Sequence, residues 1–572
     1  LAPALKAAPD AGVLVVAGEI AQARRNFAEA AALFEQAARL SPNSAAIRTE
    51  LGIARLAQGD SRAIAELQAA AGMAGSGSRP DTFLIISQLE RKQFDAALAS
   101  IAAFEKKQGA SPVIWNYRGA AWLGKQDVAR ARDSFEQALK LDPGYFAAAA
   151  NLAQLDSQAG QPAAARQRFE GVLKADPKNL NAMLALADLA LRAKDEAGYV
   201  GWLEKAAATQ PQAIQPRVTL ARYLVAKGDK AKALNVANEA IAAQPDSPAA
   251  LDLLGTVQLA AGDAVNAQST YRKLAERQSG QTGPIVKLAT AQIVAKDLEG
   301  ARKSLQNALR LQPDSLVALQ MLGGVEIQTR RFDQALTIAR QIQQQQPKSG
   351  QGHALEAQAH YALRNYPKAL DAYERAFKLE PSGALLVQEL QVYTAQGKPE
   401  IGERRILAWL TDHPKEFPLL GAVAESLLKR RQYASAADHY FTLLRQFPDN
   451  IAILNNLGWA LAELGDKRAP DYAMKAYKLS PGNPLAADTL GWALLKTGEA
   501  AKSLEYFRQA LQKSPDNPDI QYHHALALNL TGDSMRARNE LKRLFASGLR
   551  FEGESDARAL LNRLDTAPLS KP

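Results

Sequence analysis

The chain has 572 residues, of which 47% are hydrophobic and 22% are charged, and its formal net charge is +10. This composition is too apolar for an intrinsically disordered chain. With no cysteine, the chain has no disulfide, thiolate metal site or thiol nucleophile. Its basic residues are dispersed, and no basic run is longer than Lys429, Arg430 and Arg431. Because binding to nucleic-acid phosphates needs clustered positive charge, we expect no nucleic-acid partner.

Prolines recur along most of the chain at intervals of 33 or 34 residues, with one interval of 68 residues in which Ser279 replaces the proline. A period of this length identifies a stack of repeated supersecondary units. Each unit has a small residue near its eighth position, alanine near its twentieth and proline near its thirty-second, a pattern that resembles the tetratricopeptide repeat. The prolines that mark the period are Pro143, Pro177, Pro211, Pro245, Pro313, Pro347, Pro381, Pro414, Pro448, Pro481 and Pro515.

The repeat predicts an all-α solenoid, a right-handed superhelix of about sixteen helix-turn-helix units. Residues 1–75 are expected to hold the first, N-terminal units. The weakest join follows at 72–81, where a compact turn is replaced by Gly75, Ser76, Gly77, Ser78 and Pro80. This segment is either a hinge between a short and a long part of the array or a loop without a hinge role, and the loop is the preferred interpretation.

Residues 76–548 are expected to form the main array, and the unit that begins at Pro245 shows its pattern clearly. Gly262 and Asp263 make the turn between two amphipathic helices. The helices are predicted to cross at Gly255 and Ala267, because a larger side chain there would hold their backbones apart. The proline at the end of each unit cannot continue the second helix, so it ends the unit.

Residues 549–572 follow the last unit boundary, and we expect a capping helix and a tail. The helix is predicted over 554–564, where one face carries Ala557, Leu560, Leu561 and Leu564. Such a helix would cover the apolar stripe that the last repeat leaves exposed.

The start of the chain carries no basic segment or small-residue cleavage site before its first helical pattern, and it begins at Leu1. We therefore expect a processed product or an excised fragment, without its signal and lipid-anchor region. The longest apolar stretch near the start, 12–18, is far shorter than the roughly 20 residues that span a bilayer. No transmembrane segment is expected.

No P-loop, zinc-protease, serine-hydrolase or dinucleotide-binding motif occurs in the sequence. The histidines are the remaining candidates for chemistry. His353 and His360 lie seven residues apart at positions that hold leucine or tryptophan in other units, so we interpret them as packing residues rather than metal ligands. His523 and His524 are sequence neighbours and are predicted to point to different faces. The sequence predicts no enzyme, no cofactor and no metal site.

The inner face of such an array is lined by the first helix of every unit, mainly at its second, fifth, ninth and twelfth positions. In the C-terminal third, the fifth and ninth positions hold Asn455 with Trp459, Asp488 with Trp492, and Tyr522 with Leu526. Because stacked first helices lie about 10 Å apart, the two tryptophans should form adjacent rungs. Aromatic rings beside amide and carboxylate groups suit a sugar or an extended peptide. The alternative is that each indole fills space between neighbouring units.

Several stretches go beyond the generic repeat and resemble the PEP-CTERM system TPR-repeat lipoprotein family. They read DAYERAFKLEPS at 371–382, ILAWLTDHP at 406–414, LNNLGWALAELGD at 454–466, AYKLSPGNPLAADTLGWALLKTGE at 476–499 and QYHHALALNLTGD at 521–533. The two Asn/Asp-x-x-Gly-Trp units are the most specific part. Members of that family resemble secreted lipoproteins of Gram-negative bacteria, encoded beside exopolysaccharide-synthesis and exosortase genes. The resemblance implies an N-terminal signal with a lipidated cysteine, from which this cysteine-free chain departs.

Together, the repeat and the resemblance imply a protein-interaction scaffold in the bacterial cell envelope, periplasmic or outer-membrane-associated. It would assist an exopolysaccharide export or PEP-CTERM protein-sorting system. The expected partners are other proteins of that machine, with polysaccharide as a further candidate. The alternative function is a general peptide-groove receptor or co-chaperone that captures an extended segment or a helix. An enzyme is the third class, disfavoured because repeats fill the length and no catalytic motif occurs.

Overall fold

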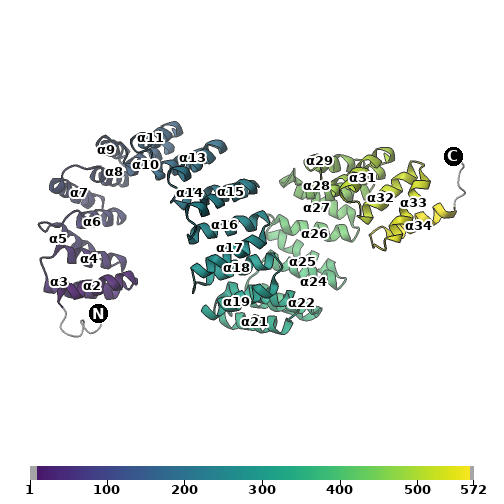
Figure 1. Cartoon of the computed structure of the whole chain (residues 1–572), viewed down its shortest axis with the longest axis horizontal. Helices are drawn as coiled ribbons and strands as arrows, with labels where there is room; N and C mark the ends of the chain where they lie inside the picture. The colour runs from purple at the N-terminus through teal and green to yellow at the C-terminus, as the bar shows by residue number, and fades with distance from the viewer. Residues whose placement is uncertain (1–9, 567–572) are drawn as a thin grey trace. The chain divides into compact units, whose positions relative to one another are not determined.

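A computed structural model describes residues 10–566, and every regular element in that range is an α-helix. The helices α2 to α34 form sixteen consecutive pairs, each joined by a tight turn, followed by one final helix (Figure 1). This confirms the predicted all-α solenoid of helix-turn-helix units. Contacts divide the chain into two compact units, Leu1–Ser279 and Gly280–Pro572, which are described separately. The boundaries expected at 75/76 and 548/549 stay predictions.

The first compact unit contains eight helix pairs, each packed against the next. Their bounds are α2 (Ala11–Ala23), α3 (Phe27–Leu40), α4 (Ala45–Ala57), α5 (Ala63–Ala71), α6 (Arg79–Glu90), α7 (Phe94–Gln108), α8 (Pro112–Gly124), α9 (Val128–Leu141), α10 (Phe146–Gln158), α11 (Pro162–Ala175), α12 (Leu180–Arg192), α13 (Glu196–Thr209), α14 (Ile214–Ala226), α15 (Lys230–Ala243), α16 (Pro248–Ala261) and α17 (Ala264–Arg277).

The second compact unit contains the other eight pairs and the final helix. Their bounds are α18 (Thr282–Val294), α19 (Leu298–Leu311), α20 (Leu316–Gln328), α21 (Phe332–Gln345), α22 (Gln351–Ala362), α23 (Tyr366–Leu379), α24 (Gly383–Ala395), α25 (Pro399–Asp412), α26 (Phe417–Lys429), α27 (Tyr433–Gln446), α28 (Ile451–Glu463), α29 (Ala469–Leu479), α30 (Pro484–Lys496), α31 (Ala500–Lys513), α32 (Pro518–Leu530), α33 (Ser534–Ala546) and α34 (Glu554–Thr566).

A first-helix glycine gives the two helices of many pairs room to approach closely. A Cβ added at Gly255 would lie 2.7 Å from the ring of Tyr271, and one added at Gly119 would lie 2.4 Å from the ring of Phe135. Ala267 is fully buried at the same crossing. The predicted crossing at Gly255 and Ala267 therefore gains a detail: the second helix fills the space above the glycine with an aromatic ring.

The turn inside every pair contains one residue with a positive φ angle. Eight of these sixteen residues are not glycine, although a left-handed conformation costs an L-residue roughly 1–2 kcal/mol. Helix packing therefore imposes this turn even where the sequence does not supply glycine. The eight residues are Arg25, Lys92, Gln126, Lys194, Lys296, Arg330, Arg364 and Arg431.

The segment between α5 and α6 has contacts at both of its ends. The Lys107 ammonium on α7 donates hydrogen bonds to the carbonyl oxygen of Ala71, at 3.0 Å, and to Oδ2 of Asp81, at 2.8 Å. Helices α5 and α6 are also packed against each other. These contacts support the interpretation of the segment as a loop rather than a hinge.

The packing between neighbouring pairs changes character along the chain at one repeat position, the thirteenth residue after each boundary proline. Asp156 and Glu326 occupy this position and are buried. Asp156 accepts hydrogen bonds from Arg132 of the preceding pair, at 2.6 Å, and from Arg168 of its own pair, at 3.0 Å. In the last four pairs the position is leucine and buried: Leu427, Leu461, Leu494 and Leu528. The C-terminal pairs are therefore joined mainly by apolar contacts.

The final helix α34 packs against α32 and α33, as the predicted capping helix should. Ala557 and Leu560 are buried beside Leu541 and Leu544 of α33. Residues 567–572 of the predicted tail lie outside the described residues. Of the helices between residues 10 and 566, none has the length and apolar character that crossing a bilayer requires.

One prediction concerns overpacking of a helix crossing. Replacing the fully buried Ala267 with leucine should lower local stability by about 1–3 kcal/mol, because the added methylenes have no space. Hydrogen exchange should then report lost protection between residues 211 and 313, with distant pairs unchanged. The matched control is Ala242→Leu, at an exposed position of α15. A uniform loss of protection along the whole chain would contradict packing between neighbours only.

Glu389 of α24 is a buried carboxyl group with incomplete pairing; it is 1% exposed. Arg405 Nη1 lies 3.1 Å from its Oε2. Even so, neither carboxyl oxygen accepts a well-aligned hydrogen bond from the residues that the structure describes. Burial raises the pKa of Glu389 to about 7, and the opposing charge of Arg405 does not cancel this effect.

This raised pKa predicts that stability around α24 falls as the pH rises. The folded pKa lies above the ordinary value of 4.5, so the stabilising contribution is complete below about pH 4.5 and is lost as the pH rises through about 7. We expect α24 to be on the order of 3 kcal/mol less stable at pH 8 than it is near pH 4. Hydrogen exchange of α24 amides, corrected for intrinsic rates, measures this difference.

Glu389→Gln should remove most of this pH dependence, whereas Glu400→Gln, at an exposed position of α25, should preserve it. Identical pH profiles for the parent chain and Glu389→Gln would show that this carboxyl group does not titrate in the range expected.

Candidate functional site

The structure brings all five predicted groove residues together. A pocket of about 420 Å³ is lined by Asn455, Trp459, Asp488, Trp492 and Tyr522, among other residues. They belong to α28, α30 and α32, the first helices of three consecutive pairs (Figure 1). Because consecutive first helices stack beside one another, side chains one repeat apart in the sequence become neighbours in space.

The two indoles form the adjacent rungs that their spacing predicts. The rings of Trp459 and Trp492 stack with their centroids 5.5 Å apart and an interplanar angle of 13°. The ring of His523, from α32, lies 4.2 Å from that of Trp492 and 5.6 Å from that of Trp459. These three rings form one compact aromatic cluster.

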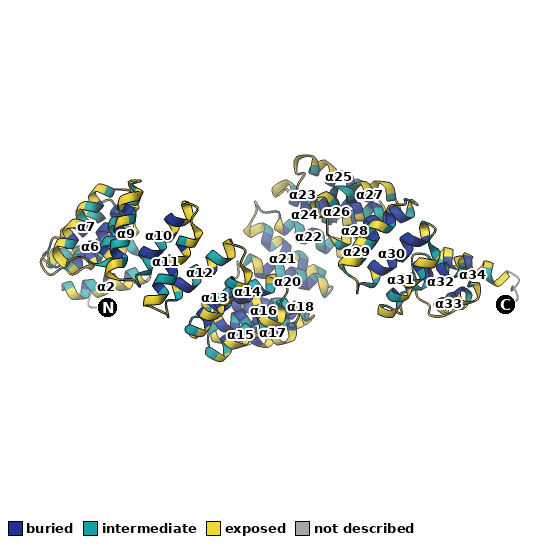
Figure 2. Cartoon of the chain, turned by 90° about the horizontal axis from the view of Figure 1, so that it is seen from above, coloured by how far each residue is buried: buried dark blue, intermediate teal, exposed yellow. Residues whose placement is uncertain are grey.

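The two tryptophans differ in burial although they occupy the same repeat position. Trp492 is 7% exposed, and Trp459 is half-buried. The indole N–H of Trp492 donates to Oε1 of Glu463 at 2.6 Å, and the Lys496 ammonium lies 5.3 Å above the ring. Helix α30, which carries Trp492, is dark blue over most of its length in Figure 2. Trp492 therefore behaves as the packing alternative predicts, whereas Trp459 keeps accessible surface in the pocket.

The three polar residues of the predicted site have different degrees of commitment. Asp488 is buried, and its Oδ1 lies 2.9 Å from Nδ1 of His523, so it is paired inside the protein. The Asn455 Oδ1 atom is buried and has no hydrogen-bond partner among residues 10–566. Tyr522 is 7% exposed, and burial, followed by the negative charge of Asp556, raises its pKa to about 12. Its hydroxyl therefore stays protonated at neutral pH.

The Tyr522 hydroxyl, which lines the pocket, forms no hydrogen bond with a residue that the structure describes. Asn455 and Tyr522 are thus the polar groups of the predicted site that are free to meet a ligand. Unsatisfied buried polar groups are uncommon in folded proteins and call for a structural explanation.

One wall of the pocket was absent from the sequence prediction. It consists of Asp519 at the start of α32, Glu552 and Gly553 in the segment before α34, and Asp556 on α34. The backbone N–H of Glu552 donates to Oδ1 of Asp519 at 3.1 Å. Gly553 packs on the neighbouring tyrosine so closely that an added Cβ would lie 2.6 Å from the Tyr522 ring.

The repeat spacing contains the signal that would have located this wall. Asp556 follows Tyr522 by 34 residues, as Tyr522 follows Asp488. It therefore takes the fifth position of what would be the next first helix. Because the sequence analysis treated 554–564 only as a capping helix, it did not extend the groove positions into α34.

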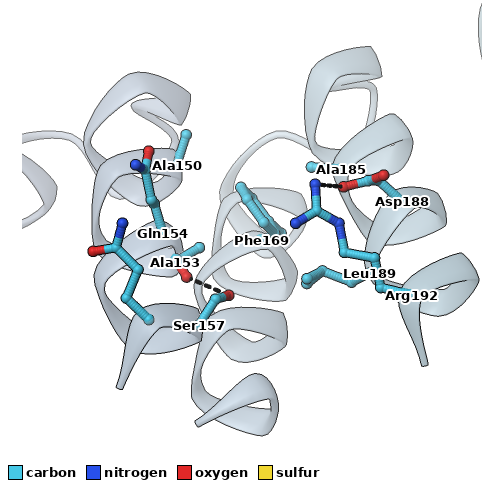
Figure 3. A pocket seen from close by; sticks show the side chains of 10 residues that line it. Ala150, Ala153, Gln154, Ser157, Phe169, Ala185, Asp188, Leu189 and Arg192 are labelled. Carbon is cyan, nitrogen blue, oxygen red and sulfur yellow. Dashed lines mark hydrogen bonds and ion pairs between the residues drawn. The ribbon is translucent and has the colours of Figure 1, made fainter. Parts of the chain in front are cut away.

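A second pocket, of about 570 Å³, lies between the first helices α10 and α12 and was not predicted from the sequence. Figure 3 shows Phe169 of α11 between the two helices, with Gln154 on one side and Arg192 on the other. Arg192 Nη2 forms an ion pair with Oδ2 of Asp188 at 2.8 Å. The walls are mostly small residues, so this pocket offers fewer groups that could select a ligand: Ala150, Ala153 and Ala185.

The histidines occupy the roles that the sequence suggested. His353 Nδ1 lies 3.3 Å from Oε2 of Glu356, and burial lowers the pKa of His360. His523 and His524 point to different neighbours, because His524 Nδ1 lies 2.8 Å from Oε2 of Glu540 on α33. Over residues 10–566, no group of three or more histidine or acidic side chains is arranged to hold a metal ion.

Three family models, each described as the tetratricopeptide repeat, match segments that together span more than half of the chain. The chain is therefore an array of tetratricopeptide repeats. The matched residues are 123–168, 157–198 and 295–359 for one model, 15–78, 218–282 and 423–484 for another, and 350–382 and 484–517 for the third.

Two curated relatives match shorter parts of the chain. A TPR repeat-containing protein of Pseudomonas aeruginosa is 27% identical over 154 residues, 26% of each chain. Tetratricopeptide repeat protein 21A of Mus musculus is 29% identical over 128 residues, 22% of this chain and 10% of the relative. The match thus spans about a quarter of the first relative and a tenth of the second.

Solved structures with detectable similarity include a Naa15/Naa10 complex bound to HypK-THB, with a TM-score of 0.36, 16% identity and 98% coverage of both chains. The APC/C hetero-tetramer Cut9-Hcn1 gives a TM-score of 0.31, 13% identity and coverage of 92% of this chain and 98% of the other. YrrB, described as a TPR protein with an unusual peptide-binding site, gives 0.27, 18% identity and coverage of 34% and 97%.

The unequal burial of the two indoles predicts unequal effects of their removal. Trp492→Ala should cost about 3–5 kcal/mol, because it empties a buried site. Trp459→Ala should cost about 1–2 kcal/mol, because its indole is only half-buried. Hydrogen exchange of α28 and α30 amides measures both losses. Acrylamide quenching, compared between the parent chain and the Trp459→Phe and Trp492→Phe variants, should show that the quencher reaches Trp459 and not Trp492. Equal losses and equal quenching would contradict the burial of these side chains.

Proposed function

We propose that this protein is a non-catalytic scaffold and that its C-terminal pocket is where a segment of a partner protein docks. Tetratricopeptide arrays typically supply binding surface rather than chemistry. The observation that carries the proposal is the pocket itself: the half-buried Trp459 and two uncommitted polar groups, on Asn455 and Tyr522, line one cavity of about 420 Å³.

The dimensions of the pocket favour an extended segment as its occupant. Its lining residues come from α28, α30 and α32, and first helices stack about 10 Å apart, so a ligand that touches all three spans about 20 Å. An extended peptide covers that distance with about six residues. The indole offers a stacking surface, and the amide and the hydroxyl offer hydrogen bonds to a peptide backbone.

We further propose that the scaffold works in the Gram-negative cell envelope, in the periplasm or at the outer membrane. There it would hold components of an exopolysaccharide export or PEP-CTERM protein-sorting machine. The support is the resemblance in the two Asn/Asp-x-x-Gly-Trp units, which supply Asn455, Trp459, Asp488 and Trp492. The most specific part of the resemblance therefore coincides with the pocket.

The glycine of each of these units has a packing role that leaves the tryptophan on the inner face. A Cβ added at Gly491 would lie 2.7 Å from the ring of Phe507, and one added at Gly458 would lie 3.1 Å from Ala473. Glycine thus lets the second helix approach, while the next residue contributes its indole to the pocket. The Gly-Trp pair couples the packing of the helix to the composition of the inner face.

Affinity capture from Gram-negative envelope extracts, followed by crosslinking, tests this proposal. The parent chain should recover export or sorting proteins, and Trp459→Ala should lose them. Trp202→Ala, which removes a half-buried indole from the other compact unit, should retain them. Recovery of a broad set of unrelated peptides would instead favour the alternative of a general peptide-groove receptor or co-chaperone. Equal recovery by the parent chain and Trp459→Ala would overturn the pocket as the docking site.

A further inference from the structure

We propose that the C-terminal pocket selects positive charge, and that its occupant is an extended peptide segment that carries arginine. This inference rests on the proposed docking role of the pocket and adds the chemical class of the side chain that it recognises. It draws on the charges of the lining residues, on their internal pairing, and on the position of the aromatic cluster beside them.

Acidic side chains outnumber basic ones around the pocket. Its carboxylates belong to Glu463, Asp488, Asp519, Glu552 and Asp556, whereas its arginine and lysine residues are Arg431 and Lys496. Glu463 is engaged by the Trp492 indole N–H and by Lys496, whose Nζ lies 3.5 Å from its Oε2. Asp488 is paired with His523. The uncompensated negative charge therefore lies on the wall formed by Asp519, Glu552 and Asp556.

The carboxylates of this wall are weakly paired with basic groups. Arg431 Nη2 lies 3.8 Å from Oε1 of Glu552, a long separation between two exposed side chains. Asp519 accepts only the backbone N–H of Glu552, a neutral donor, among residues 10–566. Asp556 is exposed and forms no ion pair within that range. A cation that enters the pocket would thus meet carboxylates that are not already neutralised.

The aromatic cluster makes arginine the best match to this wall. A guanidinium is planar, stacks on an indole face and donates paired hydrogen bonds to carboxylates. Trp459 supplies an accessible indole in the same pocket as the acidic wall. Tyr522 adds a second indication of a ligand, because this side chain is more than nine-tenths buried and its hydroxyl is unpartnered where it lines the cavity.

The same charges disfavour a polysaccharide as the occupant. A neutral sugar could stack on Trp459 but would gain nothing from the excess of carboxylates, and an acidic polymer would be repelled by them. The final helix also takes on a second role. By contributing Asp556, α34 both covers the last repeat and completes the acidic wall of the pocket.

Fluorescently labelled peptides test the inference directly on the full chain. The probe is an acetylated and amidated Gly/Ser peptide of about eight residues with arginine at alternate positions, because alternate side chains of an extended peptide share one face. Its matched control carries citrulline, which has nearly the same shape without the charge. We expect the arginine peptide to bind at least about tenfold more tightly than the citrulline peptide, with an affinity that falls as salt is added.

Charge-neutralising variants locate the source of this preference. Glu552→Gln combined with Asp556→Asn should bring the two affinities close together. Both positions are exposed, so the fold should be retained, and circular dichroism checks this. The matched control is Glu505→Gln combined with Asp516→Asn, which changes the net charge equally at exposed positions outside the pocket. This control should keep the preference for arginine.

The outcomes separate this inference from the proposed function. If both peptides bind equally and Trp459→Ala abolishes both, the preference for positive charge is overturned while the docking site stands. If only a polysaccharide binds, and Trp459→Ala abolishes that binding, the peptide occupant is overturned. If the arginine peptide binds and Trp459→Ala leaves its affinity unchanged, both the inference and the proposed docking site are overturned.

Discussion

The close approach of the two helices within each pair is the contact on which the rest of the structure depends. A first-helix glycine or alanine lets a second-helix side chain enter the crossing, as Gly255 does for Tyr271. This contact uses one face of each helix, and stacking against the next pair uses another. The inner face of the first helix is then left free of packing duties, so its residues can vary between units without disturbing the array.

Neighbouring pairs are held together by different interactions in different parts of the chain. Buried acidic groups such as Asp156 and Glu326 bind arginines across the junctions between earlier pairs. In the last four pairs the same position is leucine, and Leu427, Leu461 and Leu494 belong to one continuous apolar cluster. An apolar junction does not depend on charge pairing. It therefore provides a firm base for a pocket whose own walls are charged.

The C-terminal pocket follows from this arrangement with few additional features. Stacking brings one fifth-position residue from each of α28, α30, α32 and α34 to the same face, at spacings of 33 or 34 residues. The ninth positions of α28 and α30 add the indoles. The final helix continues the first-helix positions without a second helix after it, so it ends the array and closes one side of the pocket.

The sequence by itself determined the repeat, the helix pairs, the final helix and the grouping of Asn455, Trp459, Asp488, Trp492 and Tyr522. These follow from spacing, because each unit packs only on its neighbours and one period maps onto one step in space. Equivalent positions, however, do not have equivalent surroundings. The positions of α26 that correspond to Asn455 and Trp459 are Gly421 and Glu425, which supply no ring.

Only the tertiary structure decided which of the two indoles stays accessible. Trp492 has aromatic neighbours from both adjacent first helices, Trp459 and His523, together with a hydrogen bond to Glu463. Trp459 has such a neighbour from the following helices alone. The acidic wall was likewise decided by folding, since the segment before α34 has no repeat pattern of its own. Burial and pairing depend on the three-dimensional neighbours of a side chain, and the period of a sequence does not specify them.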